Sequence, residues 1–207
     1  MRYLDLLTAL FATVLLVSNV ASTKLVVLGP FTFDGGTLLF PLAYIFGDVL
    51  TEVYGYRKSR RVIWIGFFAL LLATLTFQAV AHLPAPPDAE SQRFGEAFGL
   101  LLGLTPRIVL GSLLAYFLGE FANAYVLAKL KVRTEGRFFW LRALASTLVG
   151  QGLDTGVFLL VAFYGVFPKE VLLAVFLSNY AFKLGVEALM LPFTYAVVGF
   201  LKRAERR

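Results

Sequence analysis

Long apolar stretches alternate with short polar segments along nearly the whole chain. A helix needs about 20 mostly apolar residues to cross the hydrocarbon core of a membrane. The pattern therefore predicts six transmembrane helices, over residues 4–22, 37–53, 62–81, 108–127, 138–164 and 171–201. The last two stretches are longer than a membrane requires. We expect them to tilt or bend, with Pro192 as the kink site in the last one.

The segment between Pro84 and Pro106 is the one long connection between these stretches. Its proline-rich start predicts a stiff turn. Residues 90–104 have the amphipathic pattern of a helix that lies on the outer membrane surface. Because no Gly-, Ser- or Pro-rich linker divides the chain, we expect a single all-α membrane domain over residues 1–207.

The composition agrees with a membrane protein and excludes several classes of enzyme. The 207 residues are 59% hydrophobic and 15% charged, with a mean hydropathy of +0.79. Soluble domains have about 45–50% apolar and about 25% charged residues. With no cysteine and one histidine, the chain cannot form a disulfide, a His/Cys metal site or a Ser–His–Asp triad. We therefore expect no cofactor, no metal and no catalytic residues.

Two short motifs bear on whether the chain is an enzyme. The chain lacks a G-x-x-x-x-G-K-[ST] loop, so it does not hydrolyse ATP by that route. Asp154-Thr155-Gly156 has the Asp-Thr-Gly spelling of soluble aspartic proteases, but it falls within a predicted helix. An intramembrane aspartic protease with Asp48 as the second carboxylate is a minor alternative.

The basic residues are unevenly distributed between the two sides of the predicted domain. Fourteen lie on one side and four on the other, and Lys183 lies within a span. Cytoplasmic loops of membrane proteins carry an excess of Lys and Arg, so we expect both termini in the cytoplasm. The net charge of +6 therefore indicates contact with membrane lipid, and we expect no nucleic-acid partner. The fourteen are Arg2, Arg57, Lys58, Arg60, Arg61, Lys129, Lys131, Arg133, Arg137, Arg142, Lys202, Arg203, Arg206 and Arg207.

Ionisable side chains inside predicted spans are the best candidates for a functional site. Such groups are costly in a membrane and usually face a protein interior or a water-filled cavity. In the fifth stretch, Thr147, Gln151, Asp154 and Phe158 recur on one helical face. Three other stretches carry polar residues at helical spacing: Tyr44, Asp48 and Glu52; Glu120 and Asn123; and Asn179, Lys183 and Glu187.

A purely structural role for these residues is also open. Lys183 could simply neutralise Glu187 or Asp154. Glu52 lies near the end of its span and could pair with Arg57 or Arg60. The roles of Glu52 and Glu120 stay undecided.

An ordered set of segments resembles the queuosine precursor transporter family, also called the vitamin uptake transporter family. The likeness covers nearly the whole chain. The segments that carry it are Ser18-Asn19 with Lys24; Phe40-Pro41 through Asp48, Glu52 and Tyr54-Gly55 to the basic turn at 57–61; Ala145-Ser146-Thr147 through Gln151 and Asp154-Thr155 to Phe163; and Asn179-Tyr180, Lys183, Pro192 and Tyr195.

The resemblance implies import of 7-deazaguanine precursors of queuosine, a modified tRNA base, across the inner membrane. The implied substrates are 7-cyano-7-deazaguanine and 7-aminomethyl-7-deazaguanine. It also implies a six-helix fold similar to the substrate-binding subunits of energy-coupling-factor transporters. A passive binding subunit that depends on separate ATPase subunits is therefore the main alternative to an independent transporter.

The polar residues of the spans suit such a ligand. The N1–H and 2-amino groups of a deazaguanine are neighbouring donors that one carboxylate can accept, and an amide can both donate and accept. We expect Asp154 and Gln151 to hold this edge and Lys183 to lie beside Asp154 or on the ligand. The other expected substrate-binding residues are Asn19, Asp48 and Glu187, with Phe158 and Tyr180 as stacking rings. Small residues at Gly111, Gly119, Gly152 and Gly156 suggest a homodimer.

Overall fold

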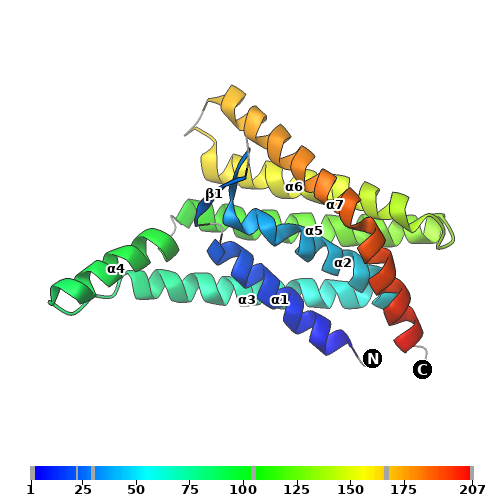
Figure 1. The fold of residues 1–207 in the computed structure, drawn as a ribbon, viewed down its shortest axis with the longest axis horizontal. Coiled ribbons are helices and arrows are strands. Elements are labelled where there is room, and N and C mark those ends of the chain that lie inside the picture. The colour runs from blue at the N-terminus through cyan, green and yellow to red at the C-terminus, as the bar shows by residue number, and fades with distance from the viewer. Residues whose placement is uncertain (1–2, 22, 29–30, 104–105, 166–167, 206–207) are drawn as a thin grey trace.

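The computed structural model describes residues 3–21, 23–28, 31–103, 106–165 and 168–205. It is a bundle of long helices with one short β-hairpin (Figure 1). The helices are α1 (Leu4–Ala21), α2 (Phe40–Tyr54), α3 (Tyr56–Ala81), α4 (Ala89–Leu102), α5 (Pro106–Arg133), α6 (Phe139–Phe163) and α7 (Lys169–Glu205). The strands β1 (Leu25–Leu28) and β2 (Phe31–Asp34) pair antiparallel, and the 3₁₀ helix η1 (Gly35–Leu38) leads toward α2.

Each of the six predicted spans coincides with a helix, and α4 covers the predicted amphipathic segment. Within the described ranges, five helices are long and apolar enough to cross a membrane: α1, α3, α5, α6 and α7. The helix α2 has 15 residues, or about 22 Å at 1.5 Å per residue. A hydrocarbon core is about 30 Å thick. The structure therefore supports a membrane protein with several spans, and the sixth crossing stays a prediction.

The fold is helical as predicted, and the short β-hairpin is an addition that the sequence analysis did not predict. Residues 25–28 and 31–34 are rich in β-branched and aromatic types, which favour strands. Each strand has only four residues. Such short strands are difficult to recognise in a sequence whose hydrophobic pattern consists mainly of stretches long enough to cross a membrane. The predicted second span also begins too early, because residues 37 and 38 belong to η1 and α2 starts at Phe40.

Both termini lie at one end of the bundle, together with the α2–α3 junction and the α5–α6 connection (Figure 1). The backbone N–H of Tyr3 donates to the Glu205 carboxylate at 3.0 Å, and the Tyr54 hydroxyl donates to the same oxygen at 2.8 Å. The helix α4 and the hairpin lie toward the opposite end. The chain therefore makes its long passes between two distinct ends of the molecule.

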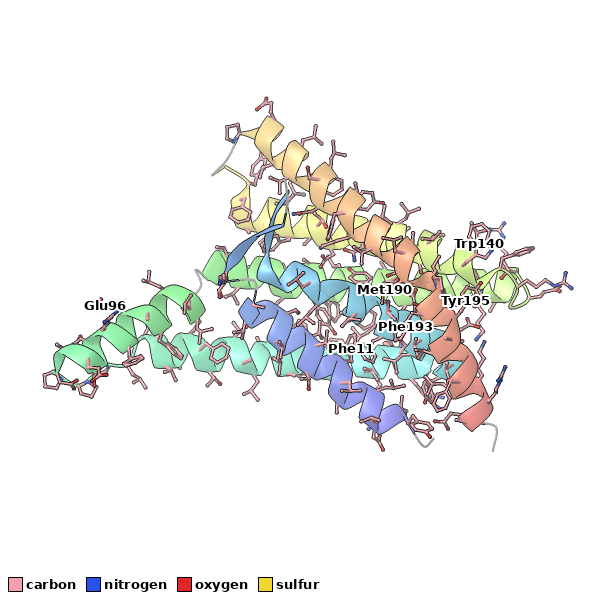
Figure 2. All side chains as sticks on the ribbon, viewed as in Figure 1. Phe11, Glu96, Trp140, Met190, Phe193 and Tyr195 are labelled. Carbon is pink, nitrogen blue, oxygen red and sulfur yellow. The ribbon has the colours of Figure 1, made fainter. Side chains whose placement is uncertain are left out.

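The surface of the bundle is apolar, and much of its interior is polar. Leu72 and Leu189 are 69% and 80% exposed. In contrast, α6 buries Arg142 and Gln151, together with several small polar residues. Apolar side chains such as Phe11, 1% exposed, fill the rest of the interior (Figure 2). This is the arrangement expected when lipid, and not water, surrounds the helices.

Glycines allow α5 and α6 to pack backbone against backbone. A Cβ at Gly119 would lie 2.8 Å from the Cβ of Asp154 and 3.0 Å from the carbonyl oxygen of Gly150. A Cβ at Gly150 would lie 2.8 Å from the Cβ of Asn123. The glycines that suggest a homodimer all face a neighbouring helix of the same chain: Gly111, Gly119, Gly152 and Gly156. Packing within one chain therefore accounts for them, and the homodimer loses that support.

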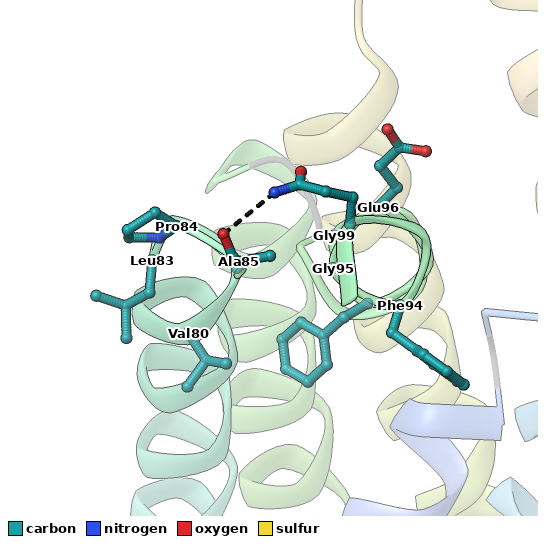
Figure 3. Close-up of a pocket in the computed structure, with 11 residues that line it drawn as sticks. Val80, Leu83, Pro84, Ala85, Phe94, Gly95, Glu96 and Gly99 are labelled. Atoms are coloured by element: carbon teal, nitrogen blue, oxygen red, sulfur yellow. Dashed lines mark hydrogen bonds between the residues drawn. The ribbon is translucent and has the colours of Figure 1, made fainter. Parts of the chain in front are cut away.

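The helix α4 extends away from the bundle and packs against the end of α3 (Figure 3). Asp88 caps it by accepting a hydrogen bond from the Ser91 N–H at 2.8 Å, and this bond lowers the pKa of Asp88 below its ordinary value. The Gln92 amide donates to the carbonyls of Ala85 and Pro86 at 3.1 and 2.8 Å. The proline-rich turn is thus tied to α4, which buries none of its described residues.

Candidate functional site

Polar side chains from four helices meet inside the bundle, and we call them the buried polar cluster. Its members other than Lys183 are each at most 8% exposed. Most of them lie away from the helix ends, so the cluster is enclosed by the bundle. The members are Asp48 from α2; Glu120 and Asn123 from α5; Thr147, Gln151 and Asp154 from α6; and Lys183 and Glu187 from α7.

Lys183 forms the ion pair of the cluster. Its Nζ lies 3.0 Å from Oδ2 of Asp154 and 3.5 Å from Oγ1 of Thr155. The sequence left Glu187 and Asp154 as alternative partners, and the structure selects Asp154. One turn earlier on α7, the Tyr180 ring packs beside Gly152, and its hydroxyl donates to the Leu148 carbonyl at 2.8 Å. These contacts set α7 against α6 so that Lys183 is level with Asp154.

Three carboxyl groups approach one another from different helices. The Asn123 amide donates to Oδ1 of Asp48 at 2.9 Å. Asp48 and Glu187 lie within hydrogen-bonding reach of each other if one of them carries a proton. Glu120 is within electrostatic range of both Asp154 and Glu187. Among the residues that the structure describes, Asp48, Glu120 and Glu187 have no ion-pair partner.

The cluster contains buried oxygen atoms that have no hydrogen-bond partner in the described part of the chain. The amide oxygens, and the carboxyl oxygens when they are ionised, can only accept a hydrogen bond, whereas the Thr147 hydroxyl can also donate. Leaving such a group unpaired costs about 1–3 kcal/mol. The cluster therefore lacks donors, which a ligand with N–H groups would supply. The atoms are Asp48 Oδ2, Glu120 Oε2, Asn123 Oδ1, Thr147 Oγ1, Gln151 Oε1, and Oε1 and Oε2 of Glu187.

Tyr44 is an aromatic neighbour that was not among the predicted site residues. It is 2% exposed, and its hydroxyl would lie 3.1 Å from a Cβ placed at Gly119. It is within electrostatic range of Asp154, Glu120 and Glu187. The available signal was its position one helical turn before Asp48 in the same span.

The two predicted stacking rings pack against other rings. The Phe158 ring lies edge-on to Phe163 with centroids 5.6 Å apart, and the Tyr180 ring stacks on Phe176 at 5.4 Å. Both residues lie on the same helices as the cluster, one turn from Asp154 and Lys183 respectively. Their stacking on a ligand stays a prediction.

Asn19 lies away from the cluster. Its amide donates to the Leu15 carbonyl within α1 at 3.0 Å, and it lines a small cavity that also includes Leu70 of α3 and Val109 of α5. No member of the cluster lines that cavity. The structure therefore does not bring Asn19 together with Asp154, and a role for it at a ligand remains a prediction.

Glu52 belongs to a separate network at the end of the bundle that holds the termini. Its carboxylate accepts from Arg142 Nη1 at 2.7 Å and from Lys202 Nζ at 2.5 Å, and Lys131 Nζ lies 3.5 Å away. These are its ion-pair partners in the described structure, and the possible pairing with Arg57 or Arg60, whose side chains are exposed on the first turns of α3, is not among them. Glu52 thus links α2 to α5, α6 and α7.

Within the described residues, no group of His, Cys, Asp and Glu side chains has the arrangement of a metal site. The groups that the cluster offers to a ligand are hydrogen-bonding and ionisable side chains. Glu120 and Asn123 belong to it as fully as Asp154 does, although the sequence left the role of Glu120 undecided and Asn123 was not a predicted site residue. Their spacing of three residues within an apolar span was the signal that placed both on one face.

Several curated proteins that are similar in sequence to this chain are named as transporters. A curated protein of Bacillus subtilis (strain 168), "Probable queuosine precursor transporter", is 35% identical over 198 residues, covering 95% of this chain and 84% of the relative. The "Queuosine precursor transporter" of Escherichia coli (strain K12) is 27% identical over 168 residues, covering 79% of this chain and 71% of the relative. No solved structure matches the chain.

A protein of Haemophilus influenzae named "Probable queuosine precursor transporter" is 26% identical over 166 residues, covering 79% of this chain and 67% of the relative. The family model described as "Putative vitamin uptake transporter" matches residues 34–197. That range includes α2 to α6, most of α7 and the entire buried polar cluster. These matches confirm the resemblance seen in the sequence: the chain belongs to this family of membrane transporters, which are not enzymes.

Proposed function

We propose that this protein imports queuosine precursors across the cell membrane and that the buried polar cluster is where they bind. The names of three bacterial relatives support the substrate. The structural observation that supports this binding site is the set of oxygen atoms without a hydrogen-bond partner that are buried between α2, α5, α6 and α7. A 7-deazaguanine base, whose ring edges carry several N–H donors, has the complementary chemistry.

Asp154 and Gln151 are the proposed partners of the N1–H and 2-amino edge of the base. They are one helical turn apart on α6, and Oε1 of Gln151 has no partner in the described structure. Lys183 Nζ donates a hydrogen bond to Oδ2 of Asp154 at 3.0 Å. Thr147, one turn before Gln151, can donate to a ring acceptor.

The proposed topology has six crossings with both termini in the cytoplasm of a bacterial inner membrane. In support, the two termini meet at one end of the bundle, and fourteen of the basic residues belong to that side. In this topology α2 is the sixth crossing. Its 15 residues would be supplemented by η1 and the hairpin, which precede it in the chain. A likeness to the substrate-binding subunits of energy-coupling-factor transporters is part of the same proposal.

Uptake of a radiolabelled deazaguanine by proteoliposomes that contain this chain alone tests the proposal. Asp154→Asn keeps the size of the side chain but replaces one acceptor oxygen with a donor, which would oppose a donor of the ligand. We expect the wild type to transport and Asp154→Asn to lose at least about 10-fold in uptake. Glu170→Gln, at an exposed position in the first turn of α7, is the control and should transport normally.

The same assay separates the alternatives. Binding without uptake by the chain alone would favour a passive subunit that depends on an ATPase. Normal uptake by Asp154→Asn would show that the carboxylate has a structural role and that the site is misassigned.

A further inference from the structure

The buried polar cluster contains more acidic than basic side chains. It holds four carboxyl groups and one ammonium group, and the ammonium of Lys183 is engaged with Asp154. Asp48, Glu120 and Glu187 have no basic partner in the described part of the chain, although they are 0%, 2% and 1% exposed. Buried carboxylates without a partner are among the costliest groups in a protein, so a positive charge supplied from outside would stabilise the site.

Several oxygens of the same three side chains also have no hydrogen-bond partner in the described structure. Four carboxyl oxygens, one each from Asp48 and Glu120 and both from Glu187, have no partner in the described structure. The Asn123 amide already donates to Asp48, and its own oxygen is unpartnered. A primary ammonium group carries three N–H donors and one positive charge. It is compact enough to be shared by carboxylates that approach from α2, α5 and α7.

We propose that Asp48, Glu120 and Glu187 form a subsite for a protonated primary amine on the substrate. The transporter would thus prefer a base with an aminomethyl arm to the same base with an uncharged arm. This inference rests on the proposed function, in which Asp154 and Gln151 hold the N1–N2 edge of the base. The arm at position 7 leaves the ring system on the side away from that edge, so in this proposal it reaches carboxyl groups other than Asp154.

Two other sources of positive charge are less consistent with the site. The described Asp and Glu residues do not have the arrangement of a metal site. Protons on the carboxyl groups would satisfy part of the cluster, but they would turn these groups into donors, which favour the acceptor nitrogen of a cyano arm. The preference is therefore the property to measure.

Calorimetric titration of the full chain, purified in detergent, with 7-aminomethyl-7-deazaguanine and 7-cyano-7-deazaguanine tests the subsite. For the wild type we expect the aminomethyl base to bind about 10- to 100-fold more tightly, as for hydrogen bonds between a charged donor and carboxylates. Glu187→Gln and Asp48→Asn keep the side-chain shapes and each remove one negative charge. In both variants the ratio of the two dissociation constants should fall toward one, while the cyano base still binds.

The matched control is Glu170→Gln, which should leave the ratio unchanged. Binding of the cyano base by the variants shows that they are folded. Equal affinity of the wild type for the two bases would overturn the amine subsite and leave the proposed function standing, and so would an unchanged ratio in both variants. Failure of the wild type to bind either base would overturn the subsite and the proposed function together.

Discussion

At the scale of single residues, Lys183 has the largest influence on the charge of the cluster. Its side chain is 12% exposed and that of Asp154 is 11%, and the two groups are 3.0 Å apart. Removing one partner of a largely buried pair leaves the other charge uncompensated, which costs about 3 kcal/mol. Lys183 thus contributes to folding as well as to the site, and the two roles have to be separated.

We predict that Lys183→Met lowers the free energy of unfolding by about 3 kcal/mol and abolishes uptake, because Asp154 then lacks its cation. The double variant Lys183→Met, Asp154→Asn removes both charges and should regain most of the stability without regaining uptake. Thermal unfolding and proteoliposome uptake measure the two effects. Lys169→Met, at an exposed lysine of α7, is the control. If the double variant transports, the pair serves only folding.

At the scale of elements, the close approach of α5 and α6 brings the two halves of the cluster together. The hypothetical Cβ contacts of 2.8 to 3.0 Å at Gly119 and Gly150 involve backbone and Cβ atoms, which cannot rotate away. A methyl group there would push the helices apart and separate Glu120 and Asn123 from Asp154. Small residues between membrane helices serve this purpose generally.

We predict that Gly119→Ala and Gly150→Ala each destabilise the protein by about 1–3 kcal/mol, the usual cost of overpacking, and reduce ligand affinity. Gly199→Ala, where a Cβ meets nothing within 4 Å, should be neutral or slightly stabilising, because alanine is the better helix former. Detergent-based unfolding and calorimetric titration would measure both properties. Wild-type stability of the two interface variants would contradict the close packing.

At the scale of the whole molecule, the two ends of the bundle differ in chemistry. At the end with the termini, Glu52 holds Arg142, Lys131 and Lys202, so that α2, α5, α6 and α7 are joined by charge. The hairpin and α4 lie toward the other end. All described residues of α4 are at least partly exposed. A ligand that reaches the buried polar cluster from one side and leaves on the other requires the helices to separate at each end in turn.

The predicted orientation can be tested directly, because the chain has no cysteine to give background labelling. We predict that Glu90→Cys, on α4, reacts with a membrane-impermeant maleimide in intact cells. Arg133→Cys, at the end of α5, should react only after lysis. The physical reason is the retention of Lys- and Arg-rich segments in the cytoplasm. The reverse labelling pattern would show that the orientation is opposite to the predicted one. Labelling of both positions in intact cells would contradict the placement of α4 and the end of α5 on opposite sides of the membrane.

The approximate position of each long helix and the polar residues that share a helical face follow from the amino-acid sequence alone. Both properties are local: they depend on the length of an apolar stretch and on a repeat of about 3.6 residues per turn. The spacing of Thr147, Gln151 and Asp154 was therefore enough to place all three on one face of α6. The short hairpin was not found, because its strands are too brief to stand out among apolar stretches.

The tertiary structure alone decided which polar residues meet. Lys183 pairs with Asp154 and not with Glu187, Glu52 binds Arg142 and not Arg57, and Asn19 lines a cavity that includes no member of the cluster. The spacing of polar residues in the sequence shows which face of a helix is polar. It does not show how neighbouring helices are rotated and shifted relative to one another when they pack. The rotation and shift are set by contacts such as Gly119 against Gly150, between segments far apart in the sequence. The charge imbalance of the cluster became visible only when these contacts had brought its members together.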